Sequence, residues 1–340
     1  MIGLATGSSS AHQRGAALLS AMLTVALVAT FAAAALWQQW RSIEVEAAER
    51  ARVQSEWILM GGLDWARLVL REDAKGSNVD SLGEPWAVPL QEARLSSFLA
   101  ADRNTSTSTD SEAGVMDAFL SGQMIDLQSL LNVTNLVQDG KLSEPDLAAF
   151  ARLFEVLGLP QSQLQKMAEN LRFALDRNAA NGSSPLAPLV PQRVEQLGWL
   201  GLPPETIAAL QPYITILPTT TPVNLNTAAA EVLEATVPGL SMADAQRMVA
   251  ARASAPFRTM DEAARAAGLD AVAAKVSITS RFFEVRSRLR LDKLIVEEHS
   301  IVQRDGIEVR VLQRWRSPPT PDGPAAQAGR GPMAAETGTR

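Results

Sequence analysis

The sequence predicts an α+β fold, in which one long N-terminal helix packs on a small antiparallel sheet and a large all-α region is inserted between the strands. Three observations lead to this prediction. The chain begins with an apolar run that continues into a helical pattern, its middle is helical and contains an internal repeat, and alternating strand patterns appear near the C-terminus.

The N-terminal feature is an uncharged apolar run from Ala16 to Trp37, which directly follows Arg14-Gly15. A helix of this length reaches about 33 Å, enough to cross a hydrocarbon core of ~30 Å. The run therefore predicts a transmembrane helix at residues 16–37. Two alternatives stay open: an uncleaved signal anchor, and a secretory signal cut at Ala33-Ala34-Ala35, for which the apolar region is too long.

The helical pattern continues past the membrane-length run. Residues 38–72 contain no proline, and apolar side chains recur near helical spacing among charged ones. We expect one continuous helix to about Arg71, with its first half in lipid and its second half under a globular head. Gly61-Gly62 predicts a kink or a close contact within it.

The stretch 73–131 is assigned to a long connection and the first strands of the sheet. Its part from 74 to 118 is rich in Gly, Ser, Thr and Asn, which predicts a surface loop. Two short strands are expected at Ala118–Leu120 and Gln123–Leu127, around a turn at Ser121-Gly122.

The middle of the chain contains a repeat. Gly158-Leu159 precedes Gln165-Lys166-Met167 by the same spacing as Gly239-Leu240 precedes Gln246-Arg247-Met248. An asparagine pair comes before each copy: Asn132 with Asn135, and Asn224 with Asn226.

The repeat predicts two related helical subdomains within an insertion at 132–275. We place them at about 132–183 and 190–275, joined by the proline-rich stretch from Ser184 to Pro191.

The second copy resembles the helix-hairpin-helix units of DNA-binding proteins, in which a glycine hairpin offers backbone N–H groups to phosphate. Here the hairpin Pro238-Gly239-Leu240-Ser241 has acidic residues on both sides, and the formal net charge of the chain is −6. Both features argue against phosphate binding. We expect the hairpin to pack two helices and Asn224 and Asn226 to turn the chain into a helix. A membrane-anchored DNA-uptake or DNA-binding protein is the alternative function.

Residues 276–316 predict an antiparallel meander. Apolar residues from Phe283 to Leu291 alternate with charged ones, mostly arginine, and a second strand is expected at Leu294–Gln303. Asp305-Gly306 predicts a hairpin before a third strand at Ile307–Trp315. The arginine row is expected to be a solvated sheet face, with an acidic partner as the alternative.

Composition excludes several kinds of site. The chain has no cysteine, which excludes disulfides and thiol chemistry, and its two histidines are His12 and His299. A catalytic triad or histidine-zinc site in the body would need His299, and no motif supplies converging partners. We therefore expect no enzyme activity. Residues 317–340 are rich in Pro, Gly and Ala and are expected to be disordered.

Taken in order, these features resemble the minor pseudopilin K family of type II secretion systems, also called general secretion pathway protein K. The matching residues are spread along almost the whole chain: Arg14-Gly15 before Ala16-Ala17-Leu18-Leu19, Gly83-Glu84-Pro85-Trp86-Ala87, Ile125-Asp126-Leu127-Gln128 with Asn132 and Asn135-Leu136, Val223-Asn224-Leu225-Asn226-Thr227-Ala228, and Ile278-Thr279-Ser280 before Phe283.

The resemblance implies a pilin-like fold and a structural function. Such a protein stands at the tip of the secretion pseudopilus, nucleates its assembly with minor pseudopilins I and J, and supports export of folded periplasmic proteins across the outer membrane. Its other partners are prepilin peptidase and the inner-membrane secretion platform, and no nucleic acid is expected. The resemblance also implies one pass through the inner membrane, a cytoplasmic N-terminus and a periplasmic head.

Two positions are assigned to processing by the resemblance. Residues 1–15 would be a prepilin leader, cleaved between Gly15 and Ala16, with Ala16 then N-methylated. Most pilin-like proteins carry glutamate at the fifth mature position, where it offsets the free amine of a neighbouring subunit, but here that position is Ser20. A subunit with none ahead of it needs no such carboxylate, so Ser20 fits the tip.

Some relatives of this family bind calcium in the head. An oxygen-rich loop offers four candidate ligands without a recognisable coordination spacing, and solvated carboxylates are the simpler interpretation. The candidates are Asp102, Asp110, Glu112 and Asp117.

Overall fold

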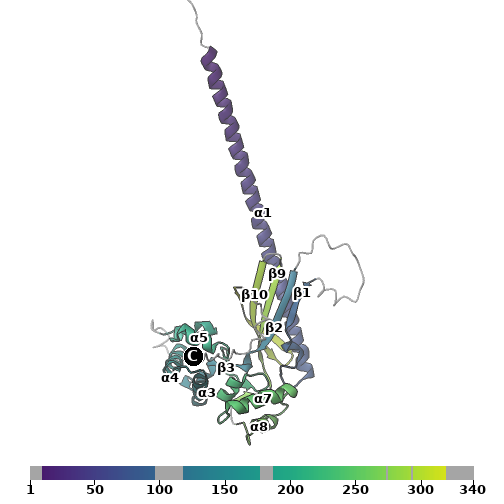
Figure 1. Ribbon diagram of the computed structural model, residues 1–340, viewed down its shortest axis with the longest axis vertical. Helices are drawn as coiled ribbons and strands as arrows, with labels where there is room; N and C mark the ends of the chain where they lie inside the picture. Colours follow the sequence, from purple (N-terminus) through teal and green to yellow (C-terminus); the bar gives the residue numbers. More distant parts are fainter. Residues whose placement is uncertain (1–9, 96–117, 177–186, 273–274, 292–293, 319–340) are drawn as a thin grey trace, which may run out of the picture. The chain divides into compact units, whose positions relative to one another are not determined.

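The structure is a computed structural model that describes residues 10–95, 118–176, 187–272, 275–291 and 294–318. It divides into two compact units, Met1–Trp57 and Ile58–Arg340. We call them the stem and the head. The predicted α+β fold is confirmed, because a long N-terminal helix, an antiparallel sheet and an inserted group of helices are all present (Figure 1).

Helix α1 runs from Ser10 to Gly76, so it forms the stem and continues as the first element of the head. Its apolar part reaches a mean hydropathy of 2.2, and among the described residues it is the one helix that could span a membrane by length and composition. The helix was expected to end near Arg71 but reaches Gly76. No glycine or proline lies between Arg71 and Gly76, and Lys75 bonds Glu72 at 2.6 Å in the last turn.

The head part of α1 packs on the sheet through one face. Leu63, Ala66 and Leu70 are buried against Phe283 and Val302 of the sheet. The chain has a close contact at Gly62, where an added Cβ would lie 3.4 Å from the Leu120 side chain. Helix and sheet therefore share one apolar core.

The sheet has five antiparallel strands in the order β1-β2-β9-β10-β11. The last three form the predicted meander, in which β9 pairs with β10 and β10 with β11. The strands are β1 (Leu90–Arg94), β2 (Ala118–Asp126), β9 (Phe282–Leu291), β10 (Leu294–Asp305) and β11 (Glu308–Ser317).

Two predictions about the first strands were wrong. The expected turn at Ser121-Gly122 lies inside the continuous strand β2, and there a Cβ on residue 122 would come within 2.8 Å of the Arg286 carbonyl oxygen. Gly122 therefore serves a close approach between β2 and β9 rather than a turn. Strand β1 lies in the segment expected to be a loop, where its short polar sequence gives little strand signal.

The insertion between β2 and β9 contains α3 to α8 and several short elements. The α-helices are α3 (Glu144–Val156), α4 (Gln161–Leu175), α5 (Pro204–Leu210), α6 (Ala230–Thr236), α7 (Met242–Ser254) and α8 (Met260–Ala267). The 3-10 helices are η1 (Pro85–Ala87, before the sheet), η2 (Leu127–Ser129), η3 (Val133–Leu136) and η4 (Val194–Leu200). The short strands are β3 (Leu131–Asn132), β4 (Val137–Gln138), β5 (Lys141–Leu142), β6 (Ile214–Thr215), β7 (Val223–Asn224) and β8 (Val276–Ser277).

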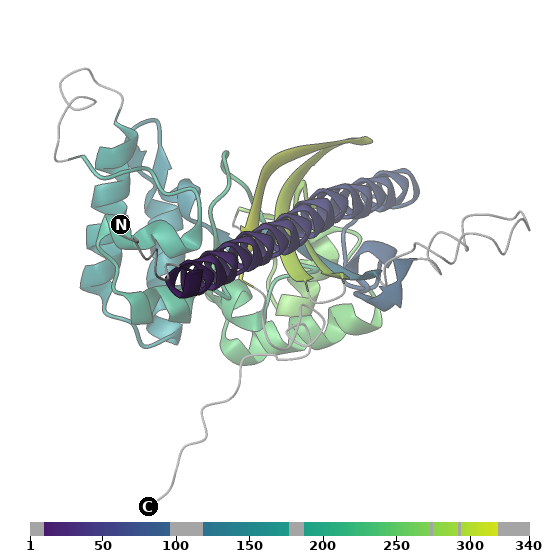
Figure 2. The ribbon, with the colours of Figure 1, turned by 90° about the horizontal axis from the view of Figure 1, so that it is seen from above.

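Parallel strand pairs close two units within the insertion. Strand β3 pairs with β6, and β7 pairs with β8. We call residues 131–215 the first helical unit and residues 223–277 the second; Figure 2 shows the first in teal and the second in green. This pairing puts residues on both sides of the proline-rich stretch into the first unit, whereas the predicted division between the subdomains was the stretch 184–191 itself.

Each unit contains a helical hairpin built on the repeated sequence. Gly158 joins α3 to α4 at φ 66°, and Gly239 joins α6 to α7 at φ 80°, a backbone conformation that favours glycine. Met167 and Met248, the last residues of the two repeated triplets, are both fully buried. Both units contribute to one continuous hydrophobic core.

Candidate functional site

From Ala16 to Trp37 the stem presents an uncharged, mostly apolar surface. Its side chains from Ala16 to Arg50 are exposed, including Leu19, Leu23 and Phe31, each at least two-thirds exposed. A soluble protein rarely leaves so much apolar surface uncovered, so this surface is suited to lipid or to other helices.

Both ends of the apolar run carry features that matter for a membrane helix. The Ser20 hydroxyl donates to the Ala17 carbonyl oxygen at 2.9 Å, so this position holds a neutral, internally bonded side chain. The Trp37 and Trp40 rings, 6.1 Å apart, mark the other end, where tryptophan commonly lies at the membrane interface. Gly15 and Ala16 lie in the first turns of α1, and cleavage between them stays a prediction.

A buried polar network, which we call the polar junction, connects the helical insertion to the sheet and to the segment after α1. Its centre is the Asn224 amide, which donates to the Asp80 carbonyl oxygen at 3.0 Å, Asp126 Oδ2 at 3.1 Å and Ser280 Oγ at 2.9 Å. The members of the polar junction are Asp73, Asp80, Asp126, Asn224, Thr227, Ser280 and Arg304.

Asp126 is a fully buried acid of the junction. Its Oδ2 accepts hydrogen bonds from Thr227 Oγ1 at 2.5 Å and Ser280 Oγ at 2.6 Å, and its Oδ1 accepts from the Gln128 N–H at 2.8 Å. Burial raises the pKa of Asp126 to about 6, although these hydrogen bonds act in the opposite direction. The junction therefore contains an acid that titrates in the mildly acidic range.

Arg304 supplies the positive charge of the junction. Its guanidinium pairs with Asp73 at 2.9 Å and with Asp80, and it lies 5.0 Å from the centre of the Phe283 ring. Burial, and then the nearby Glu84 carboxylate, raise the pKa of Asp73 to about 6. One arginine thus links the end of α1, the following loop and β10.

Carboxylate oxygens of Asp73, Asp80 and Glu84 lie within 4.8 Å of one another, a spacing that could hold a cation. Arg304 already pairs with the two aspartates, and Glu84 accepts from the Ser81 N–H at 2.9 Å and from Trp86 Nε1 at 2.8 Å. Protein donors thus bond all three carboxylates, so we assign the group to the ion-pair network. The calcium candidates Asp102, Asp110, Glu112 and Asp117 lie outside the described residues.

The hairpin of the second helical unit is not arranged to bind phosphate. Ser241 and Asp244 cap α7 reciprocally, and Arg247 pairs with Asp244. Arg252 donates to the Leu225 carbonyl oxygen at 2.5 Å. Asn224 Oδ1 accepts from the Asn226 N–H at 2.9 Å, so the asparagine turns the chain as expected. The packing role predicted for the hairpin agrees with this geometry, and the DNA-binding alternative finds no support.

The arginine row of β9 is neutralised within the sheet. Arg286 pairs with Glu284 at 2.8 Å, Arg288 pairs with Glu297 at 3.3 Å, and Arg290 pairs with a carboxylate of β1. His299, half-buried in β10, bonds Glu284 at 2.8 Å. The row therefore forms an internally paired sheet face, and it does not need an acidic partner.

The sequence segments that carried the family resemblance meet in space at the junction. Glu84, Asp126, Asn224 and Ser280 come one from each of the four segments in the head, and all lie in or beside the polar junction. Sequence reasoning missed Asp73, Asp80 and Arg304, which belong to no local motif. Arg304 meets these aspartates only in the folded chain, more than 200 positions away in sequence, so no sequence pattern signals the contacts.

Comparisons with known proteins agree with this architecture. Two family models, both described as Type II secretion system (T2SS), protein K, match residues 129–219 and 223–282. Their boundary falls between the two helical units. A type II secretion system protein K from Pseudomonas aeruginosa is 27% identical, and the similarity covers 89% of this chain and 92% of the relative.

A solved structure has a similar fold. It is the crystal structure of the GspK-GspI-GspJ complex from the type 2 secretion system of enterotoxigenic Escherichia coli. The TM-score is 0.55 at 18% identity, and the match covers 80% of this chain and 99% of the matched chain. At this identity the match shows a shared fold, which spans nearly all of that chain.

Proposed function

The chain belongs to the type II secretion system protein K family, and from this premise we propose that it is the minor pseudopilin at the tip of the secretion pseudopilus. There it nucleates pseudopilus assembly and supports export of folded periplasmic proteins across the outer membrane. The observation that carries the proposal is the similarity to protein K, which covers 89% of this chain. Its role is structural rather than catalytic.

The stem supports a single pass through the inner membrane. In this proposal the N-terminus is cytoplasmic, the head is periplasmic, and residues from Leu18 to Leu36 are the membrane anchor before assembly and part of the filament core afterwards. The exposed apolar surface and the tryptophan pair at its end support this assignment. Prepilin peptidase would cleave between Gly15 and Ala16, and Ala16 would be N-methylated.

Minor pseudopilins I and J are the proposed partners, because the similar solved structure is a complex with those two proteins. The inner-membrane secretion platform is a further proposed partner, and nucleic acid is not one. Titration calorimetry with calcium tests the separate candidate ligands of the head, Asp102, Asp110, Glu112 and Asp117.

Ser20 supports the tip position. A glutamate here would place a carboxylate in the apolar core of the filament, where an unpaired charge costs several kcal/mol. The neutral Ser20 hydroxyl, bonded to the Ala17 carbonyl oxygen, carries no such cost. A subunit with no neighbour ahead of it has no free amine to neutralise.

The test is export in the native host after deletion of the gene for this chain. We expect deletion to stop export, wild type and Ser20→Ala to restore it, and Ser20→Glu to restore it poorly, at equal protein levels. Export that continues without the gene would contradict the proposed function. Full export with Ser20→Glu would contradict only the role given to Ser20.

A further inference from the structure

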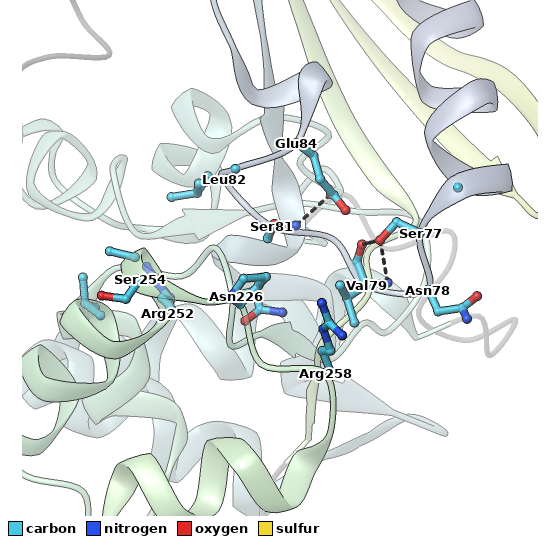
Figure 3. Close-up of a pocket in the computed structure, with 15 residues that line it drawn as sticks. Ser77, Asn78, Val79, Ser81, Leu82, Glu84, Asn226, Arg252, Ser254 and Arg258 are labelled. Atoms are coloured by element: carbon cyan, nitrogen blue, oxygen red, sulfur yellow. Dashed lines mark hydrogen bonds between the residues drawn. The ribbon is translucent and has the colours of Figure 1, made fainter.

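The head has an open cleft whose lining contains none of the members of the polar junction. It lies between the segment that follows α1 and the C-terminal end of α7, and its volume is about 990 Å³ (Figure 3). Ser77, Val79 and Leu82 come from the first wall, and Arg252 and Arg258 from the second. A cleft of this size takes a ligand of several residues, whereas a single phosphate would leave most of it empty.

Two arginines of the cleft lack a carboxylate partner within the described part of the chain. Arg258 is exposed, and in Figure 3 its side chain extends toward Val79. Arg252 is half-buried, and its one protein hydrogen bond is to the Leu225 carbonyl oxygen at 2.5 Å. Burial lowers the pKa of Arg252 to about 10, because no nearby carboxylate compensates for the lost water.

These two arginines differ from the other arginines near them. Arg247 on the same helix pairs with Asp244, and Arg304 of the polar junction pairs with two aspartates. A guanidinium matches a carboxylate closely, often through two parallel hydrogen bonds. The second wall of the cleft therefore offers positive charge that the protein leaves uncompensated.

The first wall is less polar. Leu82 of this wall is 59% exposed, and Val79 also belongs to it, while Val249 and Pro256 line the opposite side. Glu84 is the acid of this wall, but it is already bonded to the Ser81 N–H and to Trp86 Nε1. Glu84 would repel a second carboxylate, so an acidic ligand group is favoured only at the arginine wall.

We propose that this cleft binds an acidic segment of another protein, with aspartate or glutamate side chains against Arg252 and Arg258 and an apolar side chain against Leu82. The inference goes beyond the proposed function and does not depend on the position of the chain in the pseudopilus. The charge of the cleft and its exposed leucine select the occupant.

The test uses the full chain in detergent micelles and an array of labelled hexapeptides that contain leucine and one or two acidic residues. A matched array carries asparagine and glutamine in place of the acids. We expect acidic peptides to bind more tightly than their amide counterparts, and Arg258→Gln to weaken that binding about tenfold, the effect of losing one charged hydrogen bond.

Two further variants complete the design. Arg252→Gln should weaken binding similarly. Because Arg252 also bonds the Leu225 carbonyl oxygen, the thermal unfolding midpoint of this variant is measured to show whether it is still folded. Arg310→Gln is the control, since this exposed arginine of β11 pairs with Glu308 and lies outside the cleft. It should leave binding unchanged.

Three results would overturn the proposal. The first is equal binding of acidic and amide peptides, or no binding of either. The second is acidic-peptide binding that Arg258→Gln does not weaken. The third is complete displacement of the peptides by millimolar inorganic phosphate, which would make the cleft a site for small anions rather than for a protein segment.

Discussion

The two helical units share a scaffold but differ in what they hold together. In the first unit, the Asn135 side chain bonds both the N–H and the carbonyl oxygen of Thr221, at 3.0 and 2.8 Å. In the second, the Asn226 side chain bonds the same two groups of Phe257, at 2.8 and 3.0 Å. The second asparagine of each pair therefore has the same role in both units.

The first asparagine of each pair shows the difference. Asn132 bonds only neutral groups, among them the Leu217 N–H and the Thr219 carbonyl oxygen, within and just after the first unit. Asn224 instead bonds Asp126 of the sheet and the Asp80 segment that follows α1. Asn132 thus closes the first unit through nearby residues, whereas Asn224 joins the second unit to the sheet and to the segment after α1.

The largest expected effect is the loss of Asn224. Asn224→Ala removes donors from a buried carboxylate, and Asn132→Ala removes only neutral hydrogen bonds. Because bonds to charged groups contribute more, we expect about 3 kcal/mol of lost unfolding free energy for Asn224→Ala and about 2 kcal/mol for Asn132→Ala. Denaturant unfolding of the full chain in micelles measures both losses. A larger loss for Asn132→Ala would show that the contacts of Asn224 with the buried carboxylate do not add stability beyond that of neutral hydrogen bonds.

The second asparagines should behave alike. Asn135→Ala and Asn226→Ala each leave one buried N–H and one buried carbonyl oxygen without their partner. We expect a loss of about 2 kcal/mol in each case, equal within about 0.5 kcal/mol. Unfolding free energies that differ by more than this margin would show that the two units are not equivalent.

The glycines of the two hairpins give a smaller test of the same equivalence. Gly158 and Gly239 have positive φ, and nothing lies within 4 Å of an added Cβ at either position. The cost of alanine is then the backbone conformation alone, about 1 to 2 kcal/mol at each site. Similar shifts in the thermal midpoint of Gly158→Ala and Gly239→Ala support the comparison, and a shift at only one site opposes it.

The smallest expected effect is a pH dependence confined to the second unit and its junction. Asp126 has a pKa of about 6 in the folded chain against 3.8 as the ordinary value. The folded state therefore holds a proton that the unfolded state releases, so this stabilisation is complete below about pH 4 and is lost as pH rises through 6. From pH 7 to pH 5 we expect a gain of about 1 kcal/mol from Asp126.

The check is the unfolding free energy of wild type and Asp126→Asn at both pH values. The variant should lose about 1 kcal/mol of this pH response, whereas Asn132→Ala, which changes no titrating contact, should keep it. An unchanged pH response in Asp126→Asn would show that this acid is not the titrating group.

Periodic patterns and turn residues made much of the fold predictable. The long helix and the meander follow from patterns that extend over many residues, and Asp305-Gly306 marks the hairpin between β10 and β11. Strand β1 was missed because Leu90–Arg94 is short and mostly polar. Gly122 was misinterpreted because both a turn and a close approach of two backbones require glycine, so the residue type alone does not distinguish them.

The polar junction could not be predicted from local sequence. Asp80, Asp126, Asn224 and Arg304 are far apart in the chain and meet only when the sheet, the insertion and the end of α1 are assembled. The segments around Asp126 and Asn224 were recognisable as family motifs, but their shared hydrogen bonds are a tertiary property. The boundary between the helical units was likewise set by parallel strand pairs only two residues long.

We propose that this chain is a processed pseudopilin whose apolar stem stays attached to the head. Mass spectrometry of the mature N-terminus, on protein purified from the native host, tests it most directly. We expect a mature chain that begins at an N-methylated Ala16. A chain that begins near Leu36 would contradict it, because removal of the apolar stem would leave a protein that cannot join a pseudopilus.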